Sequence, residues 1–439
     1  MIRLIRVIAG SFIALSVTAC GSWFGEAEVP LPGERISVLL HEQELRPDQG
    51  AEAAAVLLPP PSPNDEWPQA GGYANHAMHH MEVGAALRRA WGIDFGAGVS
   101  SQERFLGAPV IANGRLYAMD SGSVVSAYDA GNGNRLWSIN LTPKDEDDGH
   151  FSGGLAIENG VLYAATGFAQ VIALDAGNGK EIWRSKVGGP LHSAPTVHGG
   201  RVFAVAIDNS FYALSAYDGT RLWVHKGLAR EANLLGSASP AADEGVVVVP
   251  YSSGELLGLA VDTGDVLWSD SLAPSRNANV VSTLAHIRGN PVIDRGRVFA
   301  MSYGGTMISL DLRSGRRFWD KDIGGPDAFW VAGNFLFALT RNSEVICIAR
   351  NSGRIHWVQP LPHFEDEKSK KDPIVWSGPV LASDRLIVAG SNREALALSP
   401  YSGRILGKIT LPAGVSMPPI VANGTVYFTT DDAEVVAYR

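Results

Sequence analysis

The chain has 439 residues, a formal net charge of −9, and charged side chains at only 18% of its positions. This balance argues against nucleic-acid binding, which needs a basic face to neutralise phosphates. The length exceeds what one small core requires, and 49 glycines favour an all-β protein with many short strands and tight turns. Two cysteines, Cys20 and Cys347, are too few for a disulfide framework.

The first twenty residues have the features of an export signal. Arg3 and Arg6 precede an apolar run over residues 7–17 that is too short to serve as a stable membrane span. Small residues then lead directly to Cys20, an ending that resembles a bacterial lipobox. We therefore predict a signal peptide over residues 1–19 and lipidation of Cys20, with several acyl chains giving a lasting anchor. The alternative is an ordinary signal peptide followed by an incidental cysteine.

Residues 20–63 show only weak patterning. Residues 58–63 read Leu-Pro-Pro-Pro-Ser-Pro, which is typical of an extended linker. We predict that residues 20–63 form a lipid-anchored, Pro-rich tether and that residues 64–439 form the folded domain. Residues 35–40 could form a short strand, and the sequence leaves open whether they dock on that domain.

An internal repeat runs through residues 64–439, and its period of roughly 38 to 51 residues suits one four-stranded propeller blade. Each copy has a Pro, an apolar pair, a turn Gly, an apolar strand, a polar hairpin, an alternating strand, a second turn Gly and a Trp. The first six copies end at Trp137, Trp183, Trp223, Trp268, Trp319 and Trp357. In the seventh copy Gly407 takes that place. We interpret the recurrent Trp as a wedge between neighbouring blades rather than as part of a cofactor site.

The eighth copy lacks its last strand, because the chain ends at Arg439, directly after the alternating strand. Residues 87–91, Leu-Arg-Arg-Ala-Trp, have the form of that missing strand and precede the first copy. Pairing of these two segments would close the ring without a free edge. We therefore predict an all-β fold, an eight-bladed β-propeller of four-stranded antiparallel blades closed by its N- and C-terminal strands. Seven or nine blades are the alternatives.

The motif Ala-Leu-Asp-x-x-x-Gly-x-x-x-Trp, as at residues 173–183, resembles the pyrroloquinoline-quinone-type propeller repeat. Two branches carry this repeat, the quinoprotein dehydrogenases and the BamB family, propeller lipoproteins of the outer-membrane β-barrel assembly machinery. Residues 64–72, Asn-Asp-Glu-Trp-Pro-Gln-Ala-Gly-Gly, resemble both branches. The lipobox, the length, the Pro-rich lead-in and residues 306–315 resemble the BamB family.

Resemblance to the BamB family implies a non-catalytic scaffold that is lipid-anchored in the outer membrane through Cys20 and faces the periplasm. It implies two kinds of partner, a BamA-type outer-membrane barrel insertase and unfolded outer-membrane proteins. We expect no cofactor, no metal and no nucleic acid. The quinoprotein dehydrogenase branch is the alternative, but its members resemble one another in an adjacent Cys-Cys disulfide, a Ca²⁺ site and larger chains. A propeller that binds envelope polysaccharide is a third hypothesis; only Trp330 and Trp376 would be candidate aromatics for it.

In the BamB family two neighbouring loops on one rim bind the insertase. By position relative to the blade prolines, these loops correspond to residues 233–237 and 285–289, and the candidate partner-binding residues are Leu234, Leu235, His286 and Arg288. Here the sequence departs from the family, which carries an arginine where Leu235 stands and acidic residues near His286 and Arg288. An exposed leucine pair would suit an interface anchor. Burial of both leucines in the propeller is the alternative.

Three further clusters invite a functional interpretation. His76, His79 and His80 lie close together, but no Cys or carboxylate at ligand spacing completes a zinc site nearby. We predict a solvated or capping segment there, and leave metal binding open. The charge runs at residues 144–148 and 365–372 lack the spaced ligands and central Gly of a calcium loop, so we predict solvated loops between blades.

Overall fold

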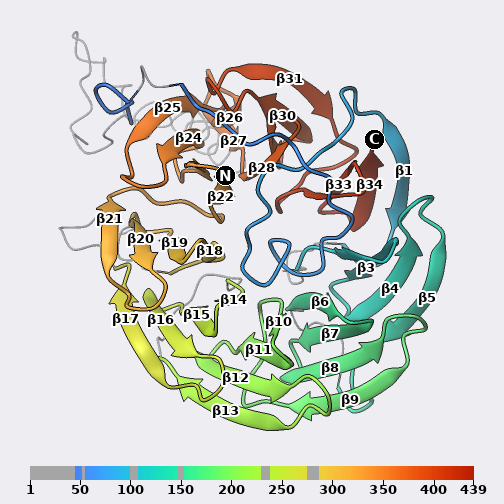
Figure 1. Cartoon of the computed structure of the whole chain (residues 1–439). Coiled ribbons are helices and arrows are strands. Elements are labelled where there is room, and N and C mark those ends of the chain that lie inside the picture. The colour runs from blue at the N-terminus through green and yellow to red at the C-terminus, as the bar shows by residue number, and fades with distance from the viewer. Residues whose placement is uncertain (1–44, 52–54, 99–106, 147–152, 229–237, 274–285) are drawn as a thin grey trace, which may run out of the picture. The chain divides into compact units, whose positions relative to one another are not determined.

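The computed structural model describes residues 45–51, 55–98, 107–146, 153–228, 238–273 and 286–439. Residues Arg46–Arg439 form one compact unit, a ring of antiparallel sheets with no α-helix among the residues described (Figure 1). Eight four-stranded sheets follow one another round the ring, which confirms the predicted eight-bladed propeller. The predicted sites at Cys20, residues 35–40, Leu234 and Leu235 fall outside the described residues.

Blades 1 to 7 each use four consecutive strands, from the innermost strand to the outer edge (Figure 1). The strands of blades 1 to 4 are β2 (Val110–Ala112), β3 (Arg115–Met119), β4 (Val124–Asp129), β5 (Arg135–Asn140), β6 (Gly154–Glu158), β7 (Val161–Thr166), β8 (Gln170–Asp175), β9 (Glu181–Lys186), β10 (Thr196–His198), β11 (Arg201–Val205), β12 (Ser210–Ser215), β13 (Arg221–Lys226), β14 (Ala241–Asp243), β15 (Val246–Pro250), β16 (Glu255–Ala260) and β17 (Val266–Ser271). Those of blades 5 to 7 are β18 (Val292–Asp294), β19 (Arg297–Met301), β20 (Met307–Asp311), β21 (Arg317–Lys321), β22 (Trp330–Ala332), β23 (Phe335–Leu339), β24 (Glu344–Ala349), β25 (Ile355–Pro360), β28 (Trp376–Ala382), β29 (Arg385–Gly390), β30 (Glu394–Leu398) and β31 (Ile405–Thr410).

Blade 8 joins the two ends of the described chain. Its strands are β32 (Ile420–Ala422), β33 (Thr425–Thr429), β34 (Glu434–Tyr438) and, as the outer strand, β1 (Arg89–Asp94). Trp91 of β1 lies opposite Ala437 of β34, and Arg88 and Arg439 exchange two backbone hydrogen bonds of 2.6 and 2.9 Å. This confirms the predicted closure, with the N-terminal strand beginning two residues later than its sequence pattern indicated.

The hydrophobic core lies between neighbouring blades. Each sheet stacks face to face on the next, so middle strands such as β15 are buried at every residue, whereas outer strands such as β13 expose one face. Cys347 of β24 is fully buried in this core, and burial raises the pKa of its thiol. It therefore packs as a small apolar residue, as its surrounding sequence predicted.

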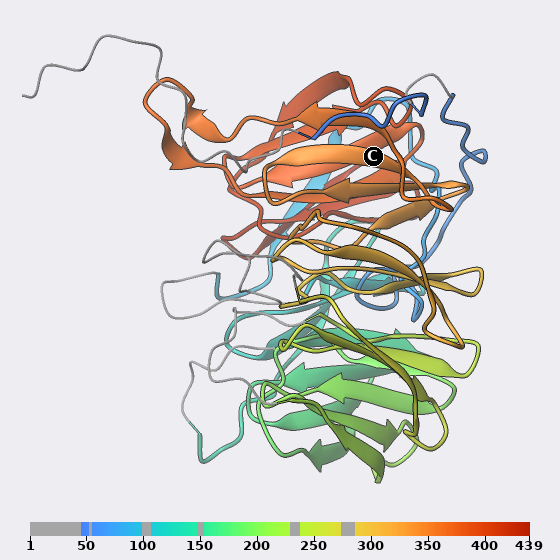
Figure 2. The same ribbon diagram turned by 90° about the vertical axis from the view of Figure 1, so that its left-hand side faces the viewer.

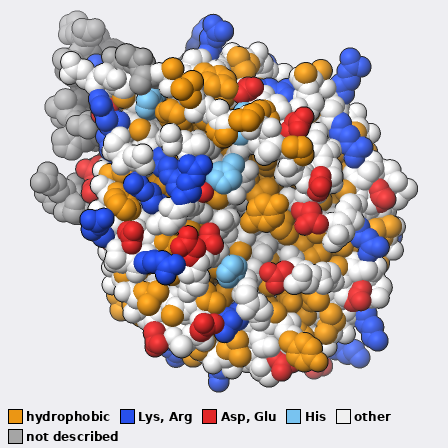
Figure 3. Space-filling model, in the orientation of Figure 1, with side chains coloured by type: hydrophobic (Ala, Val, Ile, Leu, Met, Phe, Trp, Pro, Cys, Tyr) orange, Lys and Arg blue, Asp and Glu red, His pale blue; other side chains and the backbone are white. Residues whose placement is uncertain are grey.

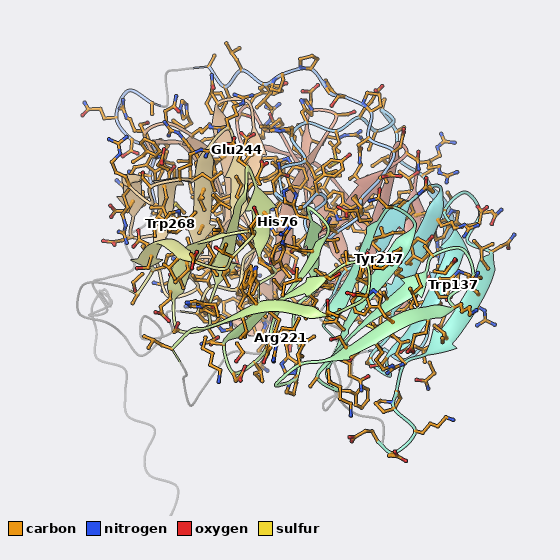
Figure 4. All side chains as sticks on the ribbon, turned by 60° about the horizontal axis from the view of Figure 1, so that its bottom comes forward. His76, Trp137, Tyr217, Arg221, Glu244 and Trp268 are labelled. Atoms are coloured by element: carbon orange, nitrogen blue, oxygen red, sulfur yellow. The ribbon has the colours of Figure 1, made fainter. Side chains whose placement is uncertain are left out.

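A repeated tryptophan joint links each of blades 1 to 6 to the next blade; Figure 4 labels two of these residues, Trp137 and Trp268. The indole N–H donates to a backbone carbonyl in the following blade's outer turn at 2.7–3.2 Å. The ring also lies on that turn's glycine, where a Cβ would come within 2.5–2.8 Å of the tryptophan. This confirms the predicted wedge role of Trp137, Trp183, Trp223, Trp268, Trp319 and Trp357.

The missing seventh tryptophan follows from how the ring closes. In blade 8, β34 and β1 come from opposite ends of the chain, so no turn with a glycine connects them. A tryptophan in place of Gly407 would therefore have no turn to dock on, and a Cβ at Gly407 would meet open space. At the next joint Trp91 lies against Gly133, but Arg439 donates to the Ala130 carbonyl in place of the indole.

Residues 64–83, here called the hub segment, run round the centre of the ring and contact one blade after another. Backbone hydrogen bonds join Trp67 to Ile111 of blade 1, and side-chain hydrogen bonds join Gln69 to Val197 of blade 3. The other contacts are Pro68 with Ile157 (blade 2), Ala74 with Ala242 (blade 4), Asn75 with Ile293 (blade 5), His79 with Trp330 (blade 6), Met81 with Ser383 (blade 7) and Asn64 with Asn423 (blade 8). The hub segment therefore ties all eight blades to one another.

The residues just before the hub segment also contact the blades. Asp48 accepts a hydrogen bond from Ile355 N at 2.7 Å and pairs with Lys321 at 3.1 Å, and the Arg354 guanidinium donates to the Gln49 carbonyl. The tether over residues 20–63 remains a prediction, but its described part from Arg46 belongs to the compact unit.

One predicted loop is instead a hairpin. Part of the charge run at residues 365–372 forms β26 (Phe364–Asp366) and β27 (Lys371–Pro373), a two-stranded sheet between blades 6 and 7. Its turn is held by Asp366, whose carboxylate accepts hydrogen bonds from Lys368 N and from Ser369 N and Oγ. The loop prediction was wrong because it took charge as the only signal and missed this aspartate-capped turn. The exposure of the run is as predicted.

Candidate partner-binding rim

The propeller has two rims with different contents. One rim, here called the loop rim, holds the connections from the outer strand of each blade to the inner strand of the next. The turns between the second and third strands of each blade lie on the same rim. The hub segment lies toward the opposite rim, here called the hub rim, where Glu66 accepts a hydrogen bond from Asn113 N in the first turn of blade 1. Figure 2 shows the β26–β27 hairpin and the blue hub segment on opposite sides of the ring. The candidate residues His286 and Arg288 belong to the loop rim.

The segment before β18 buries two successive side chains and exposes the third. His286 is 3% exposed and Ile287 is 1% exposed, whereas Arg288 is exposed. Ile287 packs in the core between blades 4 and 5, and the His286 carbonyl accepts a hydrogen bond from Tyr303 N at 3.0 Å. Of the two candidates, only the Arg288 side chain faces solvent.

The His286 ring is buried without a hydrogen-bond partner on either nitrogen among the described residues. Burial, and secondly the neighbouring Arg288 charge, lowers the pKa of His286 to about 4. The imidazole is therefore neutral near pH 7, and it lies buried next to Arg288 in the chain rather than presenting a surface contact.

A carboxyl from the following blade lies close to Arg288. Asp327 precedes β22 and accepts a hydrogen bond from Gly378 N at 2.9 Å. Removal from water raises the pKa of Asp327 to about 6, and the Arg288 charge partly offsets that rise. The two loops approach closely because residue 289 is glycine: a Cβ there would lie 2.4 Å from the Asp327 carbonyl oxygen. The rim thus offers a basic and an acidic group side by side.

Sequence reasoning missed Asp327, and it also missed contacts at the end of β13, the strand that precedes the other candidate loop. Tyr251 is fully buried, and its hydroxyl lies 2.9 Å from Nδ1 of His225. Glu255 accepts a hydrogen bond from Leu228 N at 3.0 Å, at the end of the described part of that loop. None of these residues belongs to a motif, and they are brought together only by the stacking of blades.

The histidine cluster of the hub segment does not converge on one point. His76 is buried near the centre of the ring (Figure 4), and its Nδ1 lies 2.7 Å from a backbone carbonyl of blade 5. His79 lies 3.6 Å from the Asp294 carboxylate, while His80 is flanked by a backbone carbonyl and by the Asp384 N–H. Among the described residues no group of three or more His, Cys, Asp or Glu side chains is placed to hold a metal ion. The three rings act as separate ties between the hub segment and the blades.

The hub rim also carries a polar recess of about 620 Å³. Its lining includes Glu66, Tyr73, Glu158, His198 and Asp243. Burial raises the pKa of Glu158, and the His198 charge partly offsets that effect. The recess lies between the hub segment and the first turns of blades 1 to 4.

Comparison with known proteins places this geometry in a family. The family model for outer membrane protein assembly factor BamB matches residues 91–148, 121–359 and 365–439. The chain belongs to the BamB family. Among its relatives, outer membrane protein assembly factor BamB of Escherichia coli is 27% identical over 389 residues, covering 79% of this chain and 87% of the relative. That of Bordetella pertussis is 26% identical over 359 residues, covering 81% and 88%.

Solved structures share the fold. BamB from Moraxella catarrhalis superposes with a TM-score of 0.68 at 18% identity, covering 81% of this chain and all of that one. A europium-containing methanol dehydrogenase gives a TM-score of 0.66 at 15% identity, covering 83% and 89%. At these identities the likeness concerns the propeller alone, and it assigns neither a cofactor nor a reaction to this chain. In the part of the chain that is described, no helix is long and apolar enough to cross a membrane.

Proposed function

We propose that this chain is a non-catalytic scaffold of outer-membrane protein assembly, held at the outer membrane through lipidated Cys20 and facing the periplasm. Its partners are a BamA-type barrel insertase and unfolded outer-membrane proteins. The insertase contact uses Arg288, with His286 behind it, and the neighbouring loop that carries Leu234 and Leu235. The observation that carries the proposal is membership of a family whose curated relatives are named outer membrane protein assembly factors.

The loop rim supports the location of the contact. The exposed Arg288 acts electrostatically on the half-buried Asp327, so a partner meets a basic and an acidic group on neighbouring connections between blades. A fixed surface loses little conformational entropy on binding, which favours a scaffold. Two observations support a non-catalytic role. The histidines of the hub segment serve as structural ties, and Cys347 is buried.

Delivery of unfolded proteins draws on a second feature of the fold. Blades 1 to 4 each end in an outer strand, β5, β9, β13 or β17, that has no further strand on its far edge among the described residues. An extended segment of an unfolded barrel protein can add to such an edge as a further strand, with backbone hydrogen bonds that depend little on sequence. This mode suits substrates that are diverse in sequence and uniformly rich in β-strands.

The test is co-purification from detergent-solubilised outer membranes, with the tagged full-length protein as bait and mass spectrometry as readout. The native bait should recover a BamA-type insertase, and an Arg288→Glu bait should lose it, as should Leu235→Glu. The matched control is Arg404→Glu, an equal change of charge at an exposed turn of the hub rim. An added unfolded porin should cross-link to the native bait and to all three variants, because the outer edges are unchanged. Recovery of no assembly component by the native bait would refute the scaffold, and equal loss in Arg404→Glu would refute the location.

A further inference from the structure

Four blades carry an arginine at the first residue of the second strand, and in three of them the guanidinium group has hydrogen-bond acceptors, although Nε of Arg201 and Nε of Arg385 are buried without one. Arg115 donates to two carbonyls in the next blade's outer turn at 3.1 and 3.2 Å. Arg201 donates to Gly199 O at 2.9 Å and pairs with Asp262 of the next blade at 2.7 Å. Arg385 donates to two carbonyls just after the hub segment. At this position a guanidinium group therefore usually finds an acceptor in the neighbouring turn or just after the hub segment.

The fourth, Arg297 of blade 5, differs from the other three. Its guanidinium makes no hydrogen bond or ion pair with any described residue, and its Nη1 is buried without a partner. The reason lies in the next blade, where the corresponding turn begins with Arg350, whose guanidinium is buried against Asp294. Burial, and then the Arg350 charge, lowers the pKa of Arg297. The neighbouring turn repels this arginine, whereas its counterparts accept theirs.

Arg297 instead shares an aromatic ring with a second arginine. Its Cζ lies 4.0 Å from the centre of the Phe318 ring, and the Cζ of Arg316 lies 5.3 Å from the same centre. Phe318 is 37% exposed, in a place where the other blades with a joint tryptophan carry Leu, Ile or His. An exposed ring flanked by two guanidinium groups forms a surface that is both basic and flat.

The carboxylates near Arg297 and Arg316 already interact with other groups. The neighbouring arginines of blade 5 are paired, Arg313 with Glu244 at 3.2 Å and Arg317 with Asp270 at 2.5 Å. Asp311, the carboxylate that acts on both Arg297 and Arg316, accepts two hydrogen bonds from Ser314. Arg297 and Arg316 thus share a single carboxylate, Asp311, which leaves an excess of one positive charge between them. Figure 3 shows basic side chains gathered over the region where Figure 1 places β18 to β24.

We propose that Arg297 and Arg316, spread on Phe318, form a binding site for a phosphate group. Two guanidinium groups that share one carboxylate keep a net positive charge, which attracts a phosphate monoester with close to two negative charges and three strong acceptor oxygens near neutral pH. Arginine presents its donors in a planar fork that fits such oxygens, and the exposed Arg316 offers that fork to solvent. The site lies on the hub rim, away from the proposed insertase contact.

The first experiment titrates the full-length protein with inorganic phosphate by isothermal calorimetry, at constant ionic strength set with sodium chloride. We expect saturable binding that chloride does not reproduce, and a loss of affinity of roughly ten-fold or more in Arg316→Ala. Arg316 is exposed, so this variant should fold. The matched control is Arg404→Ala, which removes the arginine at the same turn position of blade 7 and should leave phosphate binding unchanged. Absence of saturable binding, or equal losses in both variants, would overturn the proposal.

A second experiment separates the two sources of such a phosphate. The protein is sedimented with phosphatidylcholine vesicles that do or do not contain phosphatidic acid, whose headgroup is a phosphate monoester. Binding that requires phosphatidic acid and falls in Arg316→Ala but not in Arg404→Ala assigns the site to a lipid headgroup. Phosphate binding in solution without this vesicle effect assigns it to a soluble phosphorylated ligand. An Arg316-independent vesicle effect together with no calorimetric binding contradicts the site altogether.

Discussion

The circumference and the centre of this propeller are held together in different ways. At the circumference one joint is repeated, with a tryptophan of one blade lying on a turn glycine of the next and donating to its backbone. At the centre the hub segment makes contacts that each occur once, such as Trp67 with Ile111 and Asn75 with Ile293. The repeated joint is local and redundant, whereas each central contact has no substitute. The centre should therefore be the more sensitive to single changes.

The largest effect is expected where the two systems meet, at the buried pair of Arg350 and Asp294. Arg350 is 3% exposed and Asp294 6% exposed, the carboxylate also lies 3.6 Å from His79 of the hub segment, and the Arg350 carbonyl accepts the indole N–H of Trp319. Arg350→Ala leaves a buried carboxylate without its main partner and should cost about 3–5 kcal/mol of unfolding free energy, measured by urea denaturation.

The double variant Arg350→Met with Asp294→Asn is the control for that prediction. It removes both charges while keeping most of the volume, so it should recover part of the lost stability. A double variant that is no more stable than Arg350→Ala would mean that packing, and not the uncompensated charge, sets the cost.

The second prediction is that acid loosens the centre before the circumference. Burial lowers the pKa of His76 to about 4, well below the value of about 6.5 in an unfolded chain. The unfolded state therefore binds the proton more readily, so the stability due to neutral His76 is complete above pH 6.5 and is lost as the pH falls toward 4. Between pH 7 and pH 5 the loss should be about 2 kcal/mol.

Native-state hydrogen exchange distinguishes the two regions in that experiment. Amides of the hub segment should lose protection on acidification ahead of those in the tryptophan joints, which contain no group that titrates there. His286 on the loop rim shifts in the same direction as His76, whereas Asp327, whose pKa is raised to about 6, opposes both by favouring the folded state at lower pH. Uniform loss of protection around the ring would show that the centre has no separate sensitivity.

The sequence predicted the circumference of the propeller better than its centre. The joint of Trp183 on Gly219 recurs once in each of six blades, so the repeat alone predicted the blade count, the closure and the wedge role of the tryptophans. The hub segment has no repeat, and it binds mostly backbone groups, which carry no sequence signature. From the sequence, His76 was therefore interpreted only as a member of a histidine cluster. The pair of Asp294 and Arg350, 56 residues apart in different blades, had no signal at all.

The candidate site was predicted to a similar extent. Resemblance to a family located the loop that contains Arg288, because the blade prolines fix its place in the repeat. It could not predict the burial of His286, since the two consecutive residues His286 and Ile287 become buried, and Arg288 exposed, only once the blades are stacked. Asp327 was missed because it comes from the following blade and departs from the family's own placement of acidic residues.

The smallest effect tests the circumference itself, by comparing two glycines. Gly219 has φ +72°, and a Cβ there would lie 2.5 Å from the Trp183 ring, so Gly219→Ala should cost about 2 kcal/mol through backbone strain and loss of the docked contact. Gly407 occupies the tryptophan place of blade 7 and faces open space, so Gly407→Ala should change stability by less than about 1 kcal/mol in either direction. Both are measured as shifts of the urea midpoint. The closing blade has no turn for residue 407 to meet. An equal loss of stability in the two variants would therefore mean that the glycine contributes nothing to the stability of the tryptophan joint. A cost confined to Gly219→Ala would show that the ring depends on close approach at each repeated joint and tolerates its loss only where the chain ends meet.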